Sequence, residues 1–177
     1  MAQPRFLFVA GDSDWPGWAT WASEAARWVD VATEGSWVAW RLAAANNREL
    51  GRSARVFTDL ASCREAAARL QREIRRAESA ASSDPTGRWG WRLDLDGRPL
   101  ATSARSYLRY RECHYNLVQF IAAVPAALLT SHVLVLSRDT DRTDRPIGPE
   151  CPPPGPPRPQ SAKMPRAVVV HADLVGA

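Results

Sequence analysis

Apolar and polar residues alternate in two short segments of the chain, 40–44 and 91–95. A repeat of two residues is the pattern of a strand with one buried face. The first segment leads into the polar turn Asn46-Asn47, and the second leads into Asp96-Gly97. Asp-Gly is typical of a tight hairpin turn because glycine accepts a positive φ. These patterns predict two β-hairpins.

Each predicted hairpin is followed by apolar residues at helical spacing. Residues 59–78 form the first amphipathic segment, and residues 110–125 form the second, which Pro125 is expected to end. The expected core-facing positions are Leu60, Cys63, Ala67, Leu70 and Ile74 in the first helix and Tyr110, Cys113, Leu117, Phe120 and Val124 in the second.

The two hairpin–helix units share residues at a nearly constant offset. Segment 50–57 reads LGRSARVF and segment 100–107 reads LATSARSY, and Cys63 and Cys113 keep the same offset. Ordered matches of this kind indicate an internal repeat. A hairpin with one helix is marginally stable alone, whereas two copies can share a sheet and a core. We therefore expect an α+β fold: tandem ββα repeats forming a pseudo-two-fold antiparallel sheet with both helices on one face.

The repeated string resembles the YegP-like family (domain of unknown function 1508). The resemblance rests on Trp-Arg-Leu, a polar turn, Leu-x-x-Ser, an aromatic residue four positions after the serine, and a helix that carries a cysteine. It implies a compact module in which two units pair around a shared sheet. It brings no activity, ligand or catalytic residue with it.

The segments outside the repeats have different compositions. Residues 5–10 are expected to form a strand, and a helix with Trp18, Trp21 and Trp28 on one side is expected after Pro16. Such a stripe packs in a core or docks a partner. The predicted organisation is an extension (1–34), repeat 1 (35–80), repeat 2 with a strand at 132–137 (87–137), a flexible Pro-rich linker (138–163) and a tail (164–177).

Composition limits the classes of protein to consider. The chain has 177 residues, a formal net charge of +4 and a single lysine. Three cysteines without clustered spacing argue against a disulfide framework or a structural zinc site. The apolar run 117–129 is too short to cross a bilayer. We expect a cytoplasmic protein without membrane association, a monomer that is internally a pseudo-dimer.

The sequence contains no signature of the common catalytic sites. The chain contains no phosphate-binding glycine loop, no GxSxG elbow and no HExxH motif. Its three histidines are scattered, and acidic pairs such as Asp94/Asp96 fall in turn contexts. No catalytic residue, metal site or cofactor is predicted, and an enzymatic role is disfavoured.

One polar set was singled out as a candidate binding surface. Outward-facing arginines recur at equivalent positions of the two repeats, and tryptophans flank them. One interpretation is a basic groove for an anion or single-stranded nucleic acid, and the other is pairing with Asp94, Glu49 and helix carboxylates. The set comprises Arg41, Arg55, Arg92, Arg105, Trp37, Trp18 and Trp21.

Three functional hypotheses follow. The first is a non-enzymatic interaction module whose partner binds the N-terminal Trp helix or the Pro-rich tail, where a PxxPxR arrangement suits an aromatic groove. The second is a nucleic-acid-binding protein that uses the Arg/Trp face. The third is a ligand site or an enzyme with a cleft between the repeats.

Trp37 is out of phase with Trp40 in the two-residue alternation expected of a strand. A β-bulge between them is one explanation.

Overall fold

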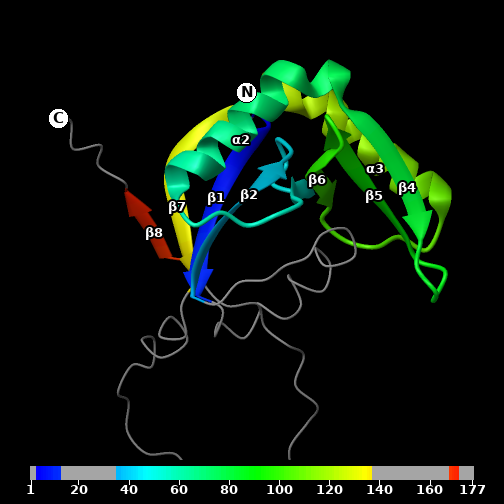
Figure 1. Ribbon diagram of the computed structural model, residues 1–177, viewed down its shortest axis with the longest axis horizontal. Coiled ribbons are helices and arrows are strands. Elements are labelled where there is room, and N and C mark those ends of the chain that lie inside the picture. The colour runs from blue at the N-terminus through cyan, green and yellow to red at the C-terminus, as the bar shows by residue number, and fades with distance from the viewer. Residues whose placement is uncertain (1–2, 13–34, 137–167, 172–177) are drawn as a thin grey trace, which may run out of the picture.

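The computed structural model describes residues 3–12, 35–136 and 168–171. All the strands of these segments belong to one sheet, and both α-helices lie on the same face of it (Figure 1). The strands are β1 (Arg5–Asp12), β2 (Ser36–Ala43), β3 (Glu49–Ser53), β4 (Glu78–Ser83), β5 (Trp89–Leu95), β6 (Arg98–Ser103), β7 (Leu128–Leu136) and β8 (Val168–His171). The helices are α2 (Leu60–Glu73) and α3 (Tyr110–Ala123), each followed by a short 3-10 helix, η1 (Ile74–Arg76) and η2 (Val124–Ala126).

The α+β class and the placement of the helices are as predicted, but the sheet is mixed rather than antiparallel. Its strand order is β4-β5-β6-β3-β2-β1-β7-β8. Strand β1 runs antiparallel to β2 and parallel to β7, whereas the other neighbours are antiparallel. The parallel pair arises because β1 lies between β2 and β7, which run in opposite directions. Residues of the predicted N-terminal extension are thus an interior strand of the sheet.

The first unit contains one strand that was not predicted, β4, whereas the closing strand of the second unit, predicted at 132–137, is present as β7. The order strand, strand, helix, 3-10 helix, strand occurs twice, ending in β4 the first time and in β7 the second. Strand β4 leaves its own unit and pairs with β5 from Ser83↔Trp89 to Glu78↔Asp94. Its sequence, ESAASS, has no large apolar residue and is mostly exposed, so no alternation marks it. Backbone hydrogen bonding to β5 holds this edge strand. The common origin of the units and their pseudo-symmetry stay predictions.

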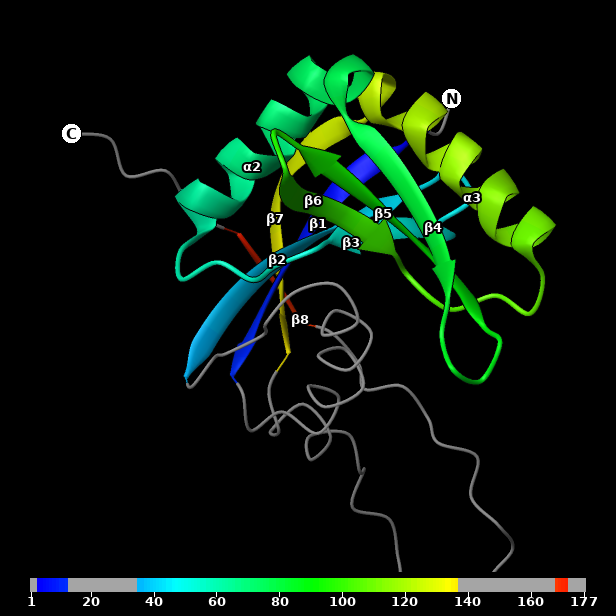
Figure 2. The same ribbon diagram turned by 45° about the vertical axis from the view of Figure 1, so that its right-hand side comes forward.

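One large core fills the space between the sheet and the helices. Helix α2 packs on β1, β2 and β7, and helix α3 packs on β3 to β6, as the turned view makes visible (Figure 2). The predicted stripe of α2 is buried from Cys63 to Ile74, and that of α3 is buried from Cys113 to Val124. Tyr110 departs from the prediction, because at the start of α3 its ring turns outward to contact Trp89 edge-on, with 5.0 Å between centroids.

The turns agree with the sequence patterns. Asp96 and Gly97 both have positive φ, 51° and 71°, as the tight hairpin between β5 and β6 requires. Between β2 and β3, Asn47 alone has a positive φ, of 66°, which asparagine tolerates better than most residues.

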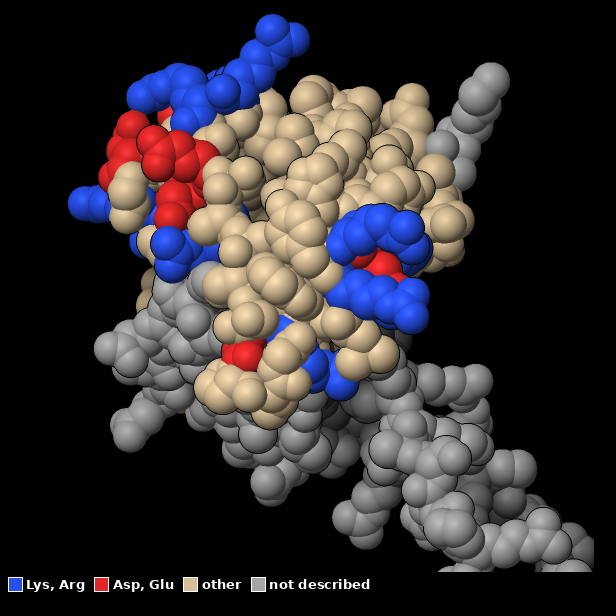
Figure 3. Space-filling view, turned by 90° about the vertical axis from the view of Figure 1, so that its right-hand side faces the viewer, with Lys and Arg blue, Asp and Glu red and all other residues tan. Residues whose placement is uncertain are grey.

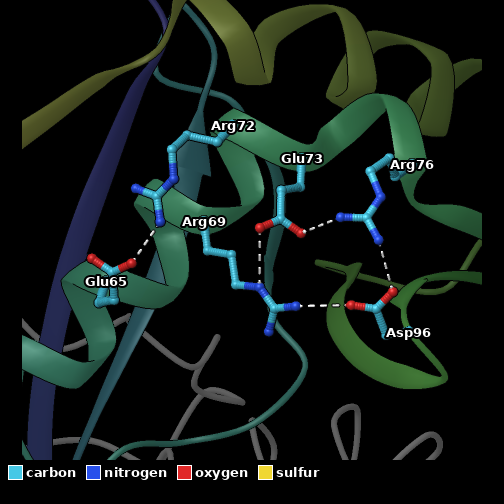
Figure 4. A network of polar contacts seen from close by, with 6 residues as sticks. All are labelled: Glu65, Arg69, Arg72, Glu73, Arg76 and Asp96. Atoms are coloured by element: carbon cyan, nitrogen blue, oxygen red, sulfur yellow. Dashed lines mark hydrogen bonds and ion pairs between the residues drawn. The ribbon is translucent and has the colours of Figure 1, made fainter.

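An ion-pair network ties the end of α2 to the β5–β6 turn. Arg69 and Arg76 each bridge Glu73 and Asp96, with N···O distances of 3.0–3.4 Å (Figure 4). On the same helix, Arg72 forms an ion pair with Glu65, with an N···O distance of 2.6 Å. The outward surface of α2 is therefore polar, and its charges are largely compensated within the protein.

Candidate functional site

The arginines predicted on the sheet form a row across the face opposite the helices. Cross-strand neighbours run Arg92, Thr102, Arg52 and Arg41 over four adjacent strands. Carboxylates pair with all three arginines: Arg41 and Arg52 contact Glu49 at 3.6 and 3.0 Å, and Arg92 contacts Asp94 at 2.7 Å. The interpretation as ion pairing is therefore confirmed for Arg41 and Arg92.

Trp37 does not offer a surface for stacking. Its side chain is 1% exposed and packs with Val9 and Ala39 in a small cluster on the helix-free face. The bulge proposed between Trp37 and Trp40 is absent, since β2 pairs with β1 without interruption from Ser36 to Ala43. The two rings simply point to opposite faces of the sheet. Trp18 and Trp21 lie outside the described residues, as does the linker at 138–163.

Arg55 and Arg105 lie in loops that lead to the two helices. Each guanidinium stacks over the aromatic ring two residues later, 5.0 Å from the centroid of Phe57 and 5.2 Å from that of Tyr107. Phe57 bridges Val38 through paired backbone hydrogen bonds, and Tyr107 is bridged to Trp89 in the same way. These arginines do not belong to the row formed by Arg41 and Arg92.

A basic hollow of about 470 Å³ opens beside the first turns of α3. Three chain segments supply its walls: the β2–β3 turn, the loop between β6 and α3, and α3 itself. The lining residues are Arg48, Arg105, Tyr107, Arg111, Glu112 and Tyr115. Only Arg105 was a sequence candidate. The sequence did contain a signal for Arg111 and Tyr115. They lie four residues apart and therefore adjacent on one helix, and the first unit has different residues, Ala61 and Glu65, at the corresponding positions.

The hollow is electropositive. Its lining has three arginines and one glutamate, and none of these arginines forms an ion pair within the part of the chain that the structure describes. Burial raises the pKa of the Tyr107 hydroxyl, and a hydrogen bond with Arg105 partly offsets the increase. The hydroxyl therefore stays protonated near neutral pH and remains available as a donor.

The two helices begin differently. Asp59 caps α2 by accepting a 2.8 Å hydrogen bond from the backbone of Ser62, an interaction that also lowers the pKa of its carboxyl. The corresponding position of α3 is Arg109, which makes no side-chain capping bond. The N-terminus of α3 therefore has a cation at the capping position, and its one acidic residue in the first turn is Glu112.

Helix α3 also exposes large apolar side chains. The exposed fractions are 50% for Tyr110, 60% for Tyr115, 46% for Val118 and 37% for Ile121. The space-filling view shows a broad area of uncharged residues on this side of the molecule, with groups of charged residues around it (Figure 3). Helix α2 exposes no large apolar residue among those that the structure describes. We refer to these four side chains as the α3 face.

The cysteines and histidines form no reactive centre in the described segments. Cys63 and Cys113 are buried free thiols in the core, as predicted. His114 is exposed beside Tyr110, with 5.8 Å between ring centroids. Residues 3–12 and 35–136 bring together no group of three His, Cys, Asp or Glu side chains that could hold a metal ion.

Burial of Cys63 makes the stability of the fold sensitive to alkaline pH. Burial raises the pKa of this thiol from 9.0 to about 12. In the unfolded chain the thiol ionises above its ordinary pKa, whereas in the folded protein it stays protonated. The associated stability is therefore complete below about pH 9 and is lost as the pH rises toward the folded-state pKa.

We expect wild type to lose about 1.4 kcal/mol of unfolding free energy per pH unit above about pH 9, beyond any loss in Cys63→Ala. Urea denaturation of both proteins at several values between neutral pH and about pH 10.5 measures this difference in slope. Parallel pH dependences of the two proteins would show that Cys63 is not protected from ionisation.

None of the helices in the described residues is long and apolar enough to cross a lipid bilayer.

Comparison with known proteins places the fold. YegP of E. coli, described as a protein of unknown function, aligns with a TM-score of 0.49 and 12% identity over 76% of this chain and 97% of YegP. A UPF0339 protein from Shewanella oneidensis aligns with a TM-score of 0.50 and 11% identity over 78% of this chain and 96% of its own. No protein-family model and no curated protein matches. The alignment with the UPF0339 protein supports a shared fold, while membership of the YegP-like family stays a prediction.

Proposed function

We propose that the protein is a non-enzymatic interaction module that binds an acidic, partly apolar segment of another protein through the α3 face. The observation that carries this proposal is the exposure of Tyr110, Tyr115, Val118 and Ile121 on one helix. Single exposed apolar residues are common on protein surfaces, but a contiguous set on one element is typical of an interface.

Helical geometry places these side chains together. Tyr110, Val118 and Ile121 are separated by eight and three residues and therefore share one side of α3. Tyr115 lies three residues before Val118, so its ring is adjacent to that strip. The rings of Tyr110 and Tyr115 fit the aromatic enrichment that is usual where binding energy concentrates.

The charge beside the α3 face indicates the chemistry of the partner. Tyr115 belongs both to the face and to the wall of the basic hollow. An apolar segment that lies along α3 therefore ends next to Arg48, Arg105 and Arg111. An acidic group on the partner is complementary to these charges, and electrostatic complementarity favours both encounter and register.

Divergence between the units supports the same location. We propose that the two units arose by duplication and are related by a pseudo-two-fold axis. The outward side of α2 is occupied by the ion pairs of Glu65, Arg69, Arg72 and Glu73 (Figure 4). At the corresponding positions, fifty residues later, α3 has the uncharged residues Tyr115, Gln119, Ala122 and Ala123. This difference supports placing the specialised surface on the second unit.

A paired substitution tests the α3 face. Val118→Lys combined with Ile121→Lys places charge on the face, and Ser79→Lys combined with Ser82→Lys adds the same charge at exposed positions of β4, outside the face. A partner is first captured with the full-length protein and then purified for direct titration. We expect the first variant to weaken binding at least about 10-fold, as loss of a central apolar contact does.

The control variant is expected to bind more tightly than the face variant, and far-UV circular dichroism should show both folded. Equal affinity of the two variants for the partner would overturn the proposal. A dimer of wild type that the face variant converts to a monomer would also overturn it, because the occupant of the face would then be a second copy of the chain.

A further inference from the structure

We infer that the basic hollow beside α3 is a binding site for a phosphate monoester group, presented by the partner segment that docks on the α3 face. The source of the group rests on the proposed function. The chemistry of the site rests on the hollow alone, whose walls are Arg48, Arg105, Tyr107, Arg111, Glu112 and Tyr115.

The charge of the lining matches a dianion. Three arginines and one glutamate give a formal charge of +2, counted over the residues that line the hollow. A phosphate monoester carries a charge of about −1.5 to −2 near neutral pH. A carboxylate or a phosphodiester carries one negative charge and would leave part of the positive charge uncompensated.

The arrangement of the arginines also favours a tetrahedral anion. Arg48, Arg105 and Arg111 come from a turn, a loop and a helix, so their guanidinium groups approach from three separate segments. The three terminal oxygens of a phosphate monoester can each accept from a different guanidinium, whereas a carboxylate offers two oxygens in one plane. Arginine is the side chain best suited to such contacts.

The arginines are not engaged elsewhere in the described part of the chain. The side chains of Arg48 and Arg111 make no hydrogen bond to the described residues, and Arg105 is held over the ring of Tyr107. Arg69 and Arg76, by contrast, form ion pairs with the carboxylate of Asp96. Three arginines without an ion pair to the described residues thus line one concave site.

Tyr107 and the start of α3 add hydrogen-bond donors. Tyr107 is 4% exposed, yet it lines the hollow, so this buried phenol is part of its inner wall. In the first turn of α3, the N–H groups of Glu112 and Cys113 donate to the Arg109 carbonyl, and Arg109 makes no side-chain capping bond. The N–H groups at the first two positions of the helix can therefore face an anion. The first unit lacks these features, having Phe57, Asp59 and Ala61 at the corresponding positions.

The hollow is large enough for more than the phosphate itself. Its volume of about 470 Å³ falls in the range of sites that take small organic groups. Tyr115 supplies an aromatic wall beside the arginines and continues into the α3 face. The site therefore suits a phosphate carried on a side chain better than a free inorganic ion.

Titration of the full-length protein with phenyl phosphate tests the chemistry, followed by the phosphorus resonance and by calorimetry. We expect saturable binding that Arg111→Ala weakens about 10-fold, as loss of one charge-assisted contact does. Alanine is tolerated here because the first unit has Ala61. Arg72→Ala, which removes an exposed arginine of α2, is the matched control and should bind as wild type does. Glu112→Gln is expected to tighten binding.

Phenylacetate and diphenyl phosphate serve as the monoanionic probes, and both should bind at least about 10-fold more weakly than phenyl phosphate. Equal binding of the three probes would overturn the inference, as would equal effects of Arg111→Ala and Arg72→Ala. An uncharged substitution of the α3 face, Val118→Ser with Ile121→Ser, replaces no residue that lines the hollow. It should leave phenyl phosphate binding unchanged, which separates the hollow from the proposed function.

Phosphatase treatment of the captured partner tests the source of the group. We expect treatment to weaken its binding to wild type and to have no further effect on Arg111→Ala. Binding of phenyl phosphate together with a partner insensitive to phosphatase would overturn the assignment of the group to the partner.

Discussion

Replacing Phe120 by alanine is expected to lower the free energy of unfolding by about 3–5 kcal/mol, the usual cost of removing a fully buried aromatic ring. Phe120 is completely buried on α3. Its ring centroid lies 4.8 Å from that of Trp91 and 6.4 Å from that of Trp40, so one side chain joins the central tryptophans of both units. A cavity there removes packing from both.

Urea denaturation followed by tryptophan fluorescence and by far-UV circular dichroism measures the change. Gln119→Ala, at the neighbouring exposed position, is the control and should change stability by less than about 0.5 kcal/mol. If Phe120→Ala leaves too little folded protein, Phe120→Leu supplies a smaller loss on the same scale. A cost below about 1 kcal/mol for Phe120→Ala would contradict the packing described for this ring.

Adding a single methyl group opposite the same ring is expected to be almost as disruptive. A Cβ atom on Gly51 would lie 2.7 Å from Phe120 Cδ2 and Cε2 and 2.7 Å from Trp91 Cη2. Two rigid rings must therefore move, and overpacking of this kind costs about 1–3 kcal/mol. Gly51→Ala should lower the urea midpoint by a corresponding amount.

The double variant Gly51→Ala with Phe120→Leu identifies the cause. If the clash with the Phe120 ring dominates, the double variant is more stable than the sum of the two single changes predicts, by about 0.5–3 kcal/mol. Additive losses would mean that the methyl group is harmful for another reason, such as the strand geometry of β3.

The sequence located the secondary structure wherever one strand face or one helix stripe is buried. Strand β5, helix α2 and helix α3 follow from their periodicity, and the Asp96-Gly97 turn follows from its backbone preference. Strand β4 left no such signal because ESAASS packs little and is held by main-chain bonds. Trp37 was predicted to lie on an exposed surface because Trp40, on the other face of β2, was assigned to the core. Both faces of β2 are in fact buried, so Trp37 is buried as well.

The candidate site was harder to foresee. Recurrence at equivalent positions drew attention to Arg41 and Arg92, and those arginines are paired in the fold. The hollow combines Arg48 with Arg105 and Arg111, which are separated by more than fifty residues at the extremes and share no local pattern. What distinguishes the two units was more informative than what repeats in them.

The sequence alone determined the elements that have a buried face or a characteristic turn, because periodicity and turn chemistry are properties of neighbouring residues. It also determined that Cys63, Cys113 and Phe120 face a core, because they fall on the apolar stripes. Only the tertiary structure decided the insertion of β1 between β2 and β7, the departure of β4 to the other unit, and the assembly of the basic hollow. These features depend on which strand edges and side chains meet although they are far apart in the sequence. Local sequence patterns do not specify such long-range contacts.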